Sequence, residues 1–190
     1  MTQLPLPDRK YDIIYADPPW PYYGDPNKMG AAGKEYKLMT LQEIQDLPVR
    51  NIANRPSVLF LWTTSIHLPS ALAVMDSWGF QYRGVGYVWV KTTLAGKVIA
   101  GMGVRPSFTK PTSEFLLIGS TVGKGRTFPL KSESQPQVVL HERLNHSQKP
   151  PIFRELIEGL FSIETEKLEL FAREKAVGWS GWGLGYPDSQ

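Results

Sequence analysis

The chain has 190 residues and a formal net charge of +3; 42% of its residues are hydrophobic and 21% are charged, as in ordinary globular proteins. This length fits one domain with a substantial core, so we expect residues 1–190 to form a single domain. The absence of cysteine excludes disulfides and thiolate zinc sites and is compatible with a reducing cytoplasm. The three histidines show no metal-ligand spacing, and the longest apolar run, residues 58–62, is far too short to cross a bilayer. We therefore predict no metal site, no membrane contact and a cytoplasmic location.

The first predicted element is a buried strand over residues 11–16, YDIIYA, because β-branched and aromatic residues dominate it. The strand leads into Asp17, which two prolines and Trp20 follow. Each proline holds its φ at about −65° and has no amide hydrogen, so Pro18 and Pro19 stiffen the turn. We therefore expect the Asp17 carboxylate and the carbonyls beside it to be acceptors with few competing donors.

Acceptors beside an aromatic side chain suit the exocyclic amine of a nucleobase. A carboxylate and a carbonyl can accept both N–H groups of the amine, and Trp20, Tyr22 or Tyr23 can stack on a base that has been flipped out of its helix. The structural alternative is that Asp17 only caps a helix or anchors a turn. The Pro-Pro-Trp context favours the first interpretation.

Helices are predicted at three places further along the chain. Thr40 and Glu43 form a capping box that opens a short helix to about residue 47. Ser65 caps a second helix over about residues 66–78, and Gly79 ends it. The apolar stripe of this second helix is assigned to the core and consists of Leu68, Leu72, Met75 and Trp78. A third helix covers about residues 151–161 and begins with a proline.

Strands are predicted over residues 57–63, 82–91, 114–119, 138–140 and 167–173, with Gly84 and Gly86 marking bulges. Strands that alternate with helices indicate an α/β fold with a mainly parallel central sheet flanked by helices. Ligands of such sheets gather beyond the carboxyl ends of the strands, where we expect Asp17, Thr63 and Arg173. A dinucleotide-binding loop is the obvious rival, but each of the glycine pairs lacks the third glycine of that fingerprint.

Two loops are candidates for contact with a substrate. The loop over residues 21–40 interleaves aromatic residues with lysines and glycines, and a plain surface loop is its alternative. The loop over residues 92–112 is rich in cations with few acids, which suits contact with phosphates, although solvated surface charge explains it equally well. The candidate phosphate ligands are Lys91, Lys97, Arg105 and Lys110.

Three motifs carry a resemblance to a known family. Asp17-Pro18-Pro19-Trp20 resembles the DPPW motif of the MT-A70 family of S-adenosylmethionine-dependent adenine N6-methyltransferases. HSQKP at residues 146–150 resembles the family motif that opens a helix, and LELFARE at residues 168–174 resembles the strand that follows it. The resemblance covers about residues 11–183, and the motif order is similar to that of the permuted β-type amino-methyltransferases. It implies a Rossmann-like class I methyltransferase fold and methylation of N6 of adenine in nucleic acid.

The resemblance also implies roles for single residues. Catalysis and orientation of the target amine are assigned to Asp17, Pro18, Pro19 and Trp20. Binding of the cofactor S-adenosylmethionine is assigned to Asp17, Ser147, Lys149, Phe171 and Arg173. An ammonium group just before a helix suits the carboxylate of the methionine moiety, which supports Lys149, with a plain surface lysine as the alternative. For Phe171 a core role is the alternative.

The sequence departs from the family pattern near the end of the chain. Many relatives place Asn followed by Glu or Gln after the last Trp-Gly, whereas this chain has Leu184 and Gly185. We expect either that backbone groups substitute for these side chains or that cofactor affinity is low.

The compact chain is similar to the DNA-modifying members of the family, so we expect DNA as the substrate polymer. The alternatives are an RNA adenine N6-methyltransferase and a non-catalytic nucleic-acid-binding partner subunit. A monomer and a homodimer are both compatible with the sequence.

Overall fold

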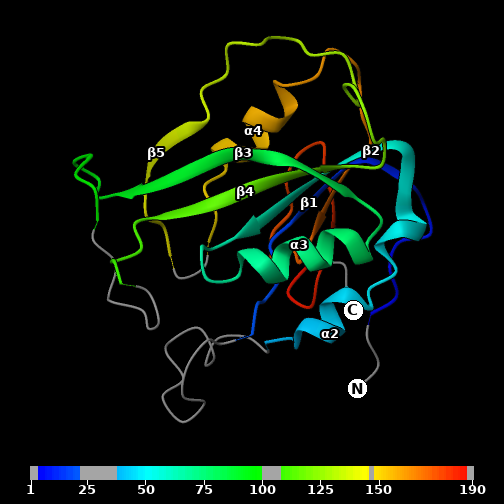
Figure 1. The fold of residues 1–190 in the computed structure, drawn as a ribbon, viewed down its shortest axis with the longest axis horizontal. Coiled ribbons are helices and arrows are strands. Elements are labelled where there is room, and N and C mark those ends of the chain that lie inside the picture. Colours follow the sequence, from blue (N-terminus) through cyan, green and yellow to red (C-terminus); the bar gives the residue numbers. More distant parts are fainter. Residues whose placement is uncertain (1–3, 22–37, 100–107, 146–147, 188–190) are drawn as a thin grey trace.

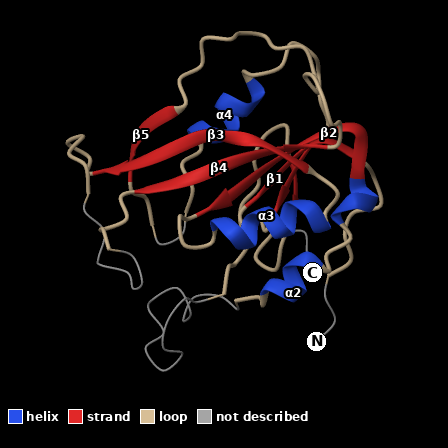
Figure 2. Ribbon diagram, in the orientation of Figure 1, coloured by secondary structure: helices blue, strands red, loops and turns tan. Residues whose placement is uncertain are grey.

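The computed structural model describes residues 4–21, 38–99, 108–145 and 148–187. Within these residues a central sheet lies between helices on its two faces (Figures 1 and 2). The strands are β1 (Tyr11–Ala16), β2 (Ala53–Thr63), β3 (Gln81–Thr92), β4 (Ser113–Ser120), β5 (Val138–Glu142), β6 (Lys167–Leu170) and β7 (Ser180–Trp182). The helices are α2 (Leu41–Gln45), the 3-10 helix η2 (Val49–Ile52), α3 (Leu68–Ser77) and α4 (Ile152–Glu158).

The sheet has the strand order β5-β3-β4-β2-β1-β6-β7. Strand β1 pairs in parallel with both β2 and β6, and the pairs β6 with β7 and β3 with β5 are also parallel. Strand β4 is antiparallel to both of its neighbours, β2 and β3. The expected α/β fold with a mainly parallel sheet is confirmed, since β4 is the only described strand that runs against the others.

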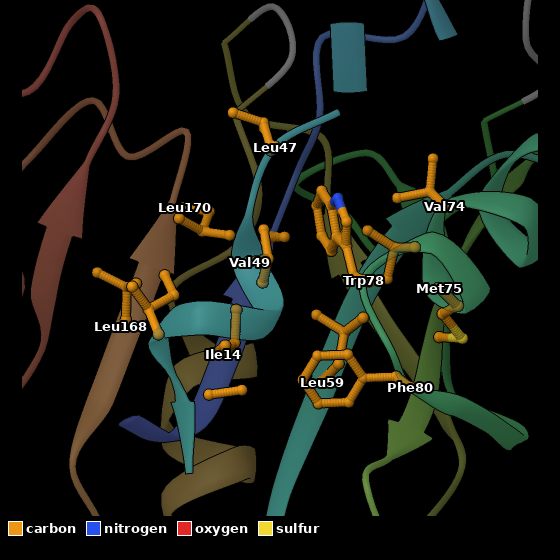
Figure 3. Packing of buried hydrophobic residues seen from close by; sticks show 14 of the residues in the cluster. Ile14, Leu47, Val49, Leu59, Val74, Met75, Trp78, Phe80, Leu168 and Leu170 are labelled. Atoms are coloured by element: carbon orange, nitrogen blue, oxygen red, sulfur yellow. The ribbon is translucent and has the colours of Figure 1, made fainter. Parts of the chain in front are cut away.

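Alternating side chains of β1 supply both faces of the sheet. Ile14 and Ala16 belong to a core shared with α2 and α3, whereas Ile13 and Tyr15 belong to a core shared with α4. Figure 3 shows the first core, in which Trp78 at the end of α3 packs among the side chains of the sheet. The indole N–H of Trp78 donates to the backbone oxygen of Ile44 in α2 over 2.9 Å, so this buried polar group is satisfied.

Several local predictions are confirmed. Thr40 and Glu43 form the capping box of α2. Gly79 follows α3 with a positive φ of 81°, which a residue without a side chain adopts freely. The pairing of β3 with β4 shifts register around Gly84 and Gly86, as expected for bulges.

Other boundaries differ from the predictions. Helix α3 begins at Leu68 with His67 as its N-cap, so Ser65 is not the cap, and Leu72 of the predicted core stripe is exposed. Strand β6 ends at Leu170 rather than at residue 173, because Phe171 has a positive φ of 64° and leaves the extended conformation. Strand β7 was not predicted, since three residues rich in Gly and Trp show no alternating pattern. In the described part of the chain, every helix is too short or too polar to cross a membrane.

Candidate active site

Four charged side chains meet at one edge of the sheet, on the face that α4 covers. Asp17 follows β1, Lys91 lies near the end of β3, Glu114 lies near the start of the antiparallel β4, and Lys149 precedes α4. Alternation explains the shared face: each of the three strand residues stands two positions from a side chain in the core beneath α4, namely Tyr15, Trp89 and Leu116. The reversed direction of β4 brings its first residues to the carboxyl ends of its neighbours.

These four residues form a continuous series of ion pairs, here called the ion chain. The Lys149 ammonium lies 2.7 Å from Oδ2 of Asp17 and 3.3 Å from Oε2 of Glu114, whose Oε1 lies 2.5 Å from Nζ of Lys91. The side chains of Lys149, Glu114 and Asp17 are only 12%, 15% and 23% exposed. The Trp62 ring centroid lies 5.5 Å from Nζ of Lys149. The ion chain therefore holds two carboxylates and two ammonium groups in a largely water-excluded place.

Burial and neighbouring charges shift the pKa values of the residues in the ion chain in opposing directions. Burial raises the pKa of Asp17 above its ordinary value, and the nearby Lys149 reduces this rise without cancelling it. Burial alone would raise the pKa of Glu114, but Lys149 and Lys91 outweigh it and hold that pKa below its usual range. Burial disfavours the charged form of Lys149, yet the two carboxylates outweigh this effect and raise its pKa. Lys149 is consequently protonated at physiological pH.

The turn after β1 is held by more donors than the sequence indicates. The Pro18 carbonyl accepts from the Trp20 backbone N–H over 2.8 Å, and Asp17 accepts from Lys149. Each of these acceptors therefore takes a donor that the sequence analysis did not name. Prolines remove only their own amide hydrogens, whereas the fold supplies a donor from a segment that lies far away in the sequence.

The Trp20 side chain is fixed at both its edge and one face. Its indole N–H donates to the backbone oxygen of Trp62 over 3.1 Å. Its ring stacks on His67, with 5.8 Å between the ring centroids and an interplanar angle of 12°. Burial lowers the pKa of His67, so this partner is a neutral ring at physiological pH. These contacts hold the Trp20 ring in one orientation, three residues after Asp17 in the chain.

Two further predicted residues, Phe171 and Arg173, follow the end of β6 at the topological switch point of the sheet. Strand β2 follows β1 on one side and β7 follows β6 on the other, so the switch point lies between the carboxyl ends of β1 and β6. The ring of Phe171 meets that of Trp182 edge to face at 5.7 Å. Gly183 approaches so closely that a Cβ atom there would lie 2.6 Å from the Ala172 oxygen. This packing supports the core role of Phe171, whose ring is only partly buried and so can also meet a ligand.

The structure brings Asp17, Lys149 and Lys91 together, and the charge of Arg173 is near enough to lower the pKa of Asp17. Lys97 and Lys110 are exposed on the connection between β3 and β4. Tyr22, Tyr23, Arg105 and Ser147 lie outside the described residues. In the described ranges no group of three or more His, Asp or Glu could hold a metal ion.

Glu114 and Trp62 are site residues that the sequence analysis missed. Both lie at the carboxyl edge on the face of α4, and Glu114 joins the two lysines. The signal that could have found Glu114 is its position at one end of a strand, two residues from buried Leu116. This signal can be used only when the direction of β4 in the sheet is known. The sequence of a short apolar strand does not show whether it pairs in parallel or antiparallel.

Comparison with known proteins agrees with the three motifs. The sequence profile of the MT-A70 family matches residues 11–185. The type II methyltransferase M.MunI from Mycoplasma sp is 33% identical over 202 residues, covering 97% of this chain and 82% of the relative. The N6-methyladenosine RNA methyltransferase MTA1 of Pyricularia oryzae is 28% identical, covering 91% of this chain and 46% of the relative. The human N(6)-adenine-specific methyltransferase METTL4 is 27% identical, covering 92% of this chain and 37% of the relative.

The mainly parallel sheet, with an acidic Pro-Pro-Trp turn at its switch point, defines a methyltransferase with a Rossmann-like fold. The chain belongs to the MT-A70 family and is an adenine N6-methyltransferase of that family. It spans most of the Mycoplasma relative and less than half of the other two.

Proposed function

We propose that this chain transfers a methyl group from S-adenosylmethionine to N6 of adenine in DNA. The observation that carries the proposal is the Asp17 carboxylate, held by Lys149 at the switch point of the sheet. Similarity to a type II methyltransferase along most of both chains supports DNA as the polymer, with RNA as the alternative.

The groups around the switch point fit the proposed cofactor. S-adenosylmethionine has a carboxylate that suits a cation and an adenosine that suits an aromatic side chain. Lys149 has three N–H donors and the ion chain uses two of them, so one donor remains for the carboxylate. Phe171 and Arg173 stand beyond the end of β6, where we assign them to the adenosine, with Ser147 as a further candidate. When bound, the cofactor supplies an electrophilic methyl group.

The acceptors at the DPPW turn are assigned to the adenine amine. Lys149 occupies Oδ2 of Asp17, so Oδ1 can accept one amine N–H. The Pro18 carbonyl has two lone pairs and gives one to the Trp20 N–H, which leaves one for the second amine hydrogen. Because the pKa of Asp17 is raised, its carboxylate is a better acceptor than an exposed aspartate for the proton that N6 loses. The rate gain then comes mainly from orientation.

The remaining substrate contacts follow from position. Trp20 lines the base site, and Tyr22 and Tyr23 stay stacking candidates. Lys97 and Lys110 are exposed and are assigned to phosphates together with Arg105, whereas Lys91 would first have to leave Glu114. A monomer and a homodimer both stay open, and a cytoplasmic location stays a prediction.

The substrate is tested with purified protein, labelled cofactor and three polymers: single-stranded DNA, duplex DNA and RNA. We expect N6-methyladenine in DNA. Methylation of RNA alone would overturn the choice of DNA. Failure to bind S-adenosylmethionine at millimolar concentration in calorimetry would instead favour a non-catalytic partner subunit.

The role of Asp17 is tested by Asp17→Ala, with Asp76→Ala on the exposed side of α3 as the control. We expect the first change to lower kcat by about 100-fold or more, since the amine loses its orienting acceptor. Asp76→Ala should leave kcat unchanged, and both variants should stay folded by circular dichroism. Activity of Asp17→Ala close to wild type would show that the assigned role is wrong.

A further inference from the structure

A short hairpin projects beyond the carboxyl end of β3, at the left of Figure 1. Its two arms are joined by hydrogen bonds from the Ile99 N–H to the Lys91 oxygen and from the Thr93 N–H to the Lys97 oxygen. The turn is closed by a bond from the Gly96 N–H to the Thr93 oxygen, with Gly96 at a positive φ of 77°. The hairpin over residues 91–99 is therefore a defined structure rather than an irregular loop.

Leu94 stands in this turn with 88% of its surface exposed. Single exposed leucines are common on protein surfaces and mean little alone. This one is unusual because hydrogen bonds on both sides fix the turn that presents it. Turns of this kind usually carry polar residues or glycine. The exposed Leu94 side chain at the tip adds no packing that would stabilise the fold of this chain.

The position of the hairpin connects Leu94 with the active site. Its first residue, Lys91, is part of the ion chain and is joined through Glu114 and Lys149 to Asp17. Leu94 is three residues further on, and three residues span at most about 10 Å. Lys97 follows on the return arm and is exposed. The hairpin thus offers an apolar tip and a cation to whatever occupies the edge of the site.

An adenine in a duplex cannot reach Asp17 while it is paired and stacked, because the carboxylate lies in a site that is only 23% exposed. Proteins that open a base step often insert an apolar side chain, leucine included, into the stack, with cations on the phosphates nearby. We propose that Leu94 is such a wedge: it enters the stack of a DNA duplex beside the target adenine and supports the flipped state. This inference rests on the proposed function and specifies double-stranded DNA as its substrate.

The test compares the same mixed-sequence DNA as a duplex and as separated strands, with N6-methyladenine quantified in each. The variants are Leu94→Ala and Leu94→Met, and the control is Val177→Ala, which truncates a fully exposed apolar side chain in the connection between β6 and β7. Circular dichroism melts and sedimentation establish folding and oligomeric state for every variant.

We expect Leu94→Ala to lower kcat/KM on the duplex by about 10-fold or more and on separated strands by less than about twofold, because only the duplex needs a base opened. Leu94→Met keeps an apolar wedge and should stay near wild type on both, as should Val177→Ala. Equal losses on the two substrates would overturn the wedge, as would a Leu94→Ala variant that loses activity by changing its oligomeric state.

Two further outcomes separate this inference from the proposed function. Wild-type activity on separated strands or RNA but never on the duplex overturns the wedge and leaves adenine methylation standing. Wild-type protein that methylates none of these polymers overturns both.

Discussion

Glu114 lies between two ammonium groups and determines how Lys149 is held. Its two oxygens face Lys91 and Lys149 separately, so neither lysine depends on a shared acceptor atom. Two carboxylates and two ammonium groups balance each other in the ion chain. Such a set tolerates burial only while it is complete, because removing one member leaves a charge without its partner.

The Glu114→Gln substitution should therefore lower the free energy of unfolding by more than the loss of an exposed ion pair does. We expect the free energy of unfolding to fall by about 1–3 kcal/mol, since Lys91 loses its carboxylate in a place that is mostly shielded from water. The matched control is Glu133→Gln, which breaks the exposed pair with Arg126 and should change stability by less than about 0.5 kcal/mol. Denaturant unfolding measures both. Equal effects would mean that the ion chain is no more than surface charge.

The raised pKa of Asp17 leads to a prediction about pH. The proposed role of Asp17 requires an ionised carboxylate, so kcat/KM should fall on the acid side with an apparent pKa above the ordinary value of 3.8. Since the folded-state pKa exceeds the unfolded one, protonation favours the folded chain. The contribution of Asp17 to stability is therefore greatest below pH 3.8 and is lost as pH rises through its folded-state pKa.

Substitutions of Glu114 and Lys149, the two charged neighbours of Asp17, should move the acid limb of the pH profile, where kcat/KM falls at low pH, in opposite directions. Glu114 raises the pKa of Asp17 and Lys149 lowers it. Glu114→Gln should then shift the limb to lower pH and Lys149→Gln to higher pH, as pH profiles of residual activity would measure. Shifts in the same direction would mean that the limb belongs to another group.

At the scale of elements, the chain segments that follow β6 and β7 pack closely against each other. The Ala172 N–H donates to the Trp182 oxygen over 3.0 Å, and Gly183 then passes directly over the Phe171–Ala172 backbone. The positive φ of Phe171 belongs to the same arrangement, because it turns the chain out of β6 and places its ring on Trp182. A non-glycine residue in this conformation costs about 1 kcal/mol or more, which is typical of functional sites.

Gly183→Ala and Gly185→Ala form a matched pair in the segment that follows β7. A Cβ at Gly183 would lie 2.6 Å from the Ala172 oxygen and 2.9 Å from the Phe171 carbonyl carbon, both backbone atoms that cannot rotate away. We expect Gly183→Ala to destabilise the chain by about 1–3 kcal/mol, which is about 2–4 °C in Tm per kcal/mol. At Gly185 the nearest atom is 3.8 Å away, so Gly185→Ala should be neutral. Calorimetric melts check both, and equal Tm values would contradict the predicted crowding.

At the scale of the whole molecule, the two edges of the sheet differ. The carboxyl edge bears the ion chain, the switch point and the Leu94 hairpin, whereas the connection after β4 leaves the opposite edge with exposed Lys124 and Arg126. Cations are thus present on both edges, but only those at the carboxyl edge lie beside the active site.

A salt series distinguishes the two sets of cations. Lys97→Gln combined with Lys110→Gln should weaken DNA binding and reduce the slope of log K against log salt by about 1–2, as expected for two lost phosphate contacts. Lys124→Gln combined with Arg126→Gln, which removes the same charge at the other edge, should leave the slope unchanged. Equal effects from both edges would indicate nonspecific attraction without a preferred face.

Local patterns determined much of this architecture. The run of apolar β-branched and aromatic residues before Asp17 predicts β1, and the Thr40–Glu43 spacing predicts its capping box, because both signals depend on neighbours in the sequence. The same holds for the Asp-Pro-Pro-Trp turn and the glycines of β3. Element boundaries near Ser65 and residue 173 could not be predicted, since a backbone angle at Phe171 and a packed N-cap at His67 decide them.

By itself the sequence determined the fold class, through the alternation of strands and helices, and it pointed to the DPPW turn and to the two proposed poles of the site, Asp17 and Lys149, through contiguous motifs. Only the tertiary structure decided that these poles touch, that Glu114 joins Lys149 to Lys91, and which donor each acceptor of the DPPW turn takes. The physical reason is the direction of β4. An antiparallel strand brings its first residues to the edge where the parallel strands end, and strand direction follows from pairing between segments far apart in the chain.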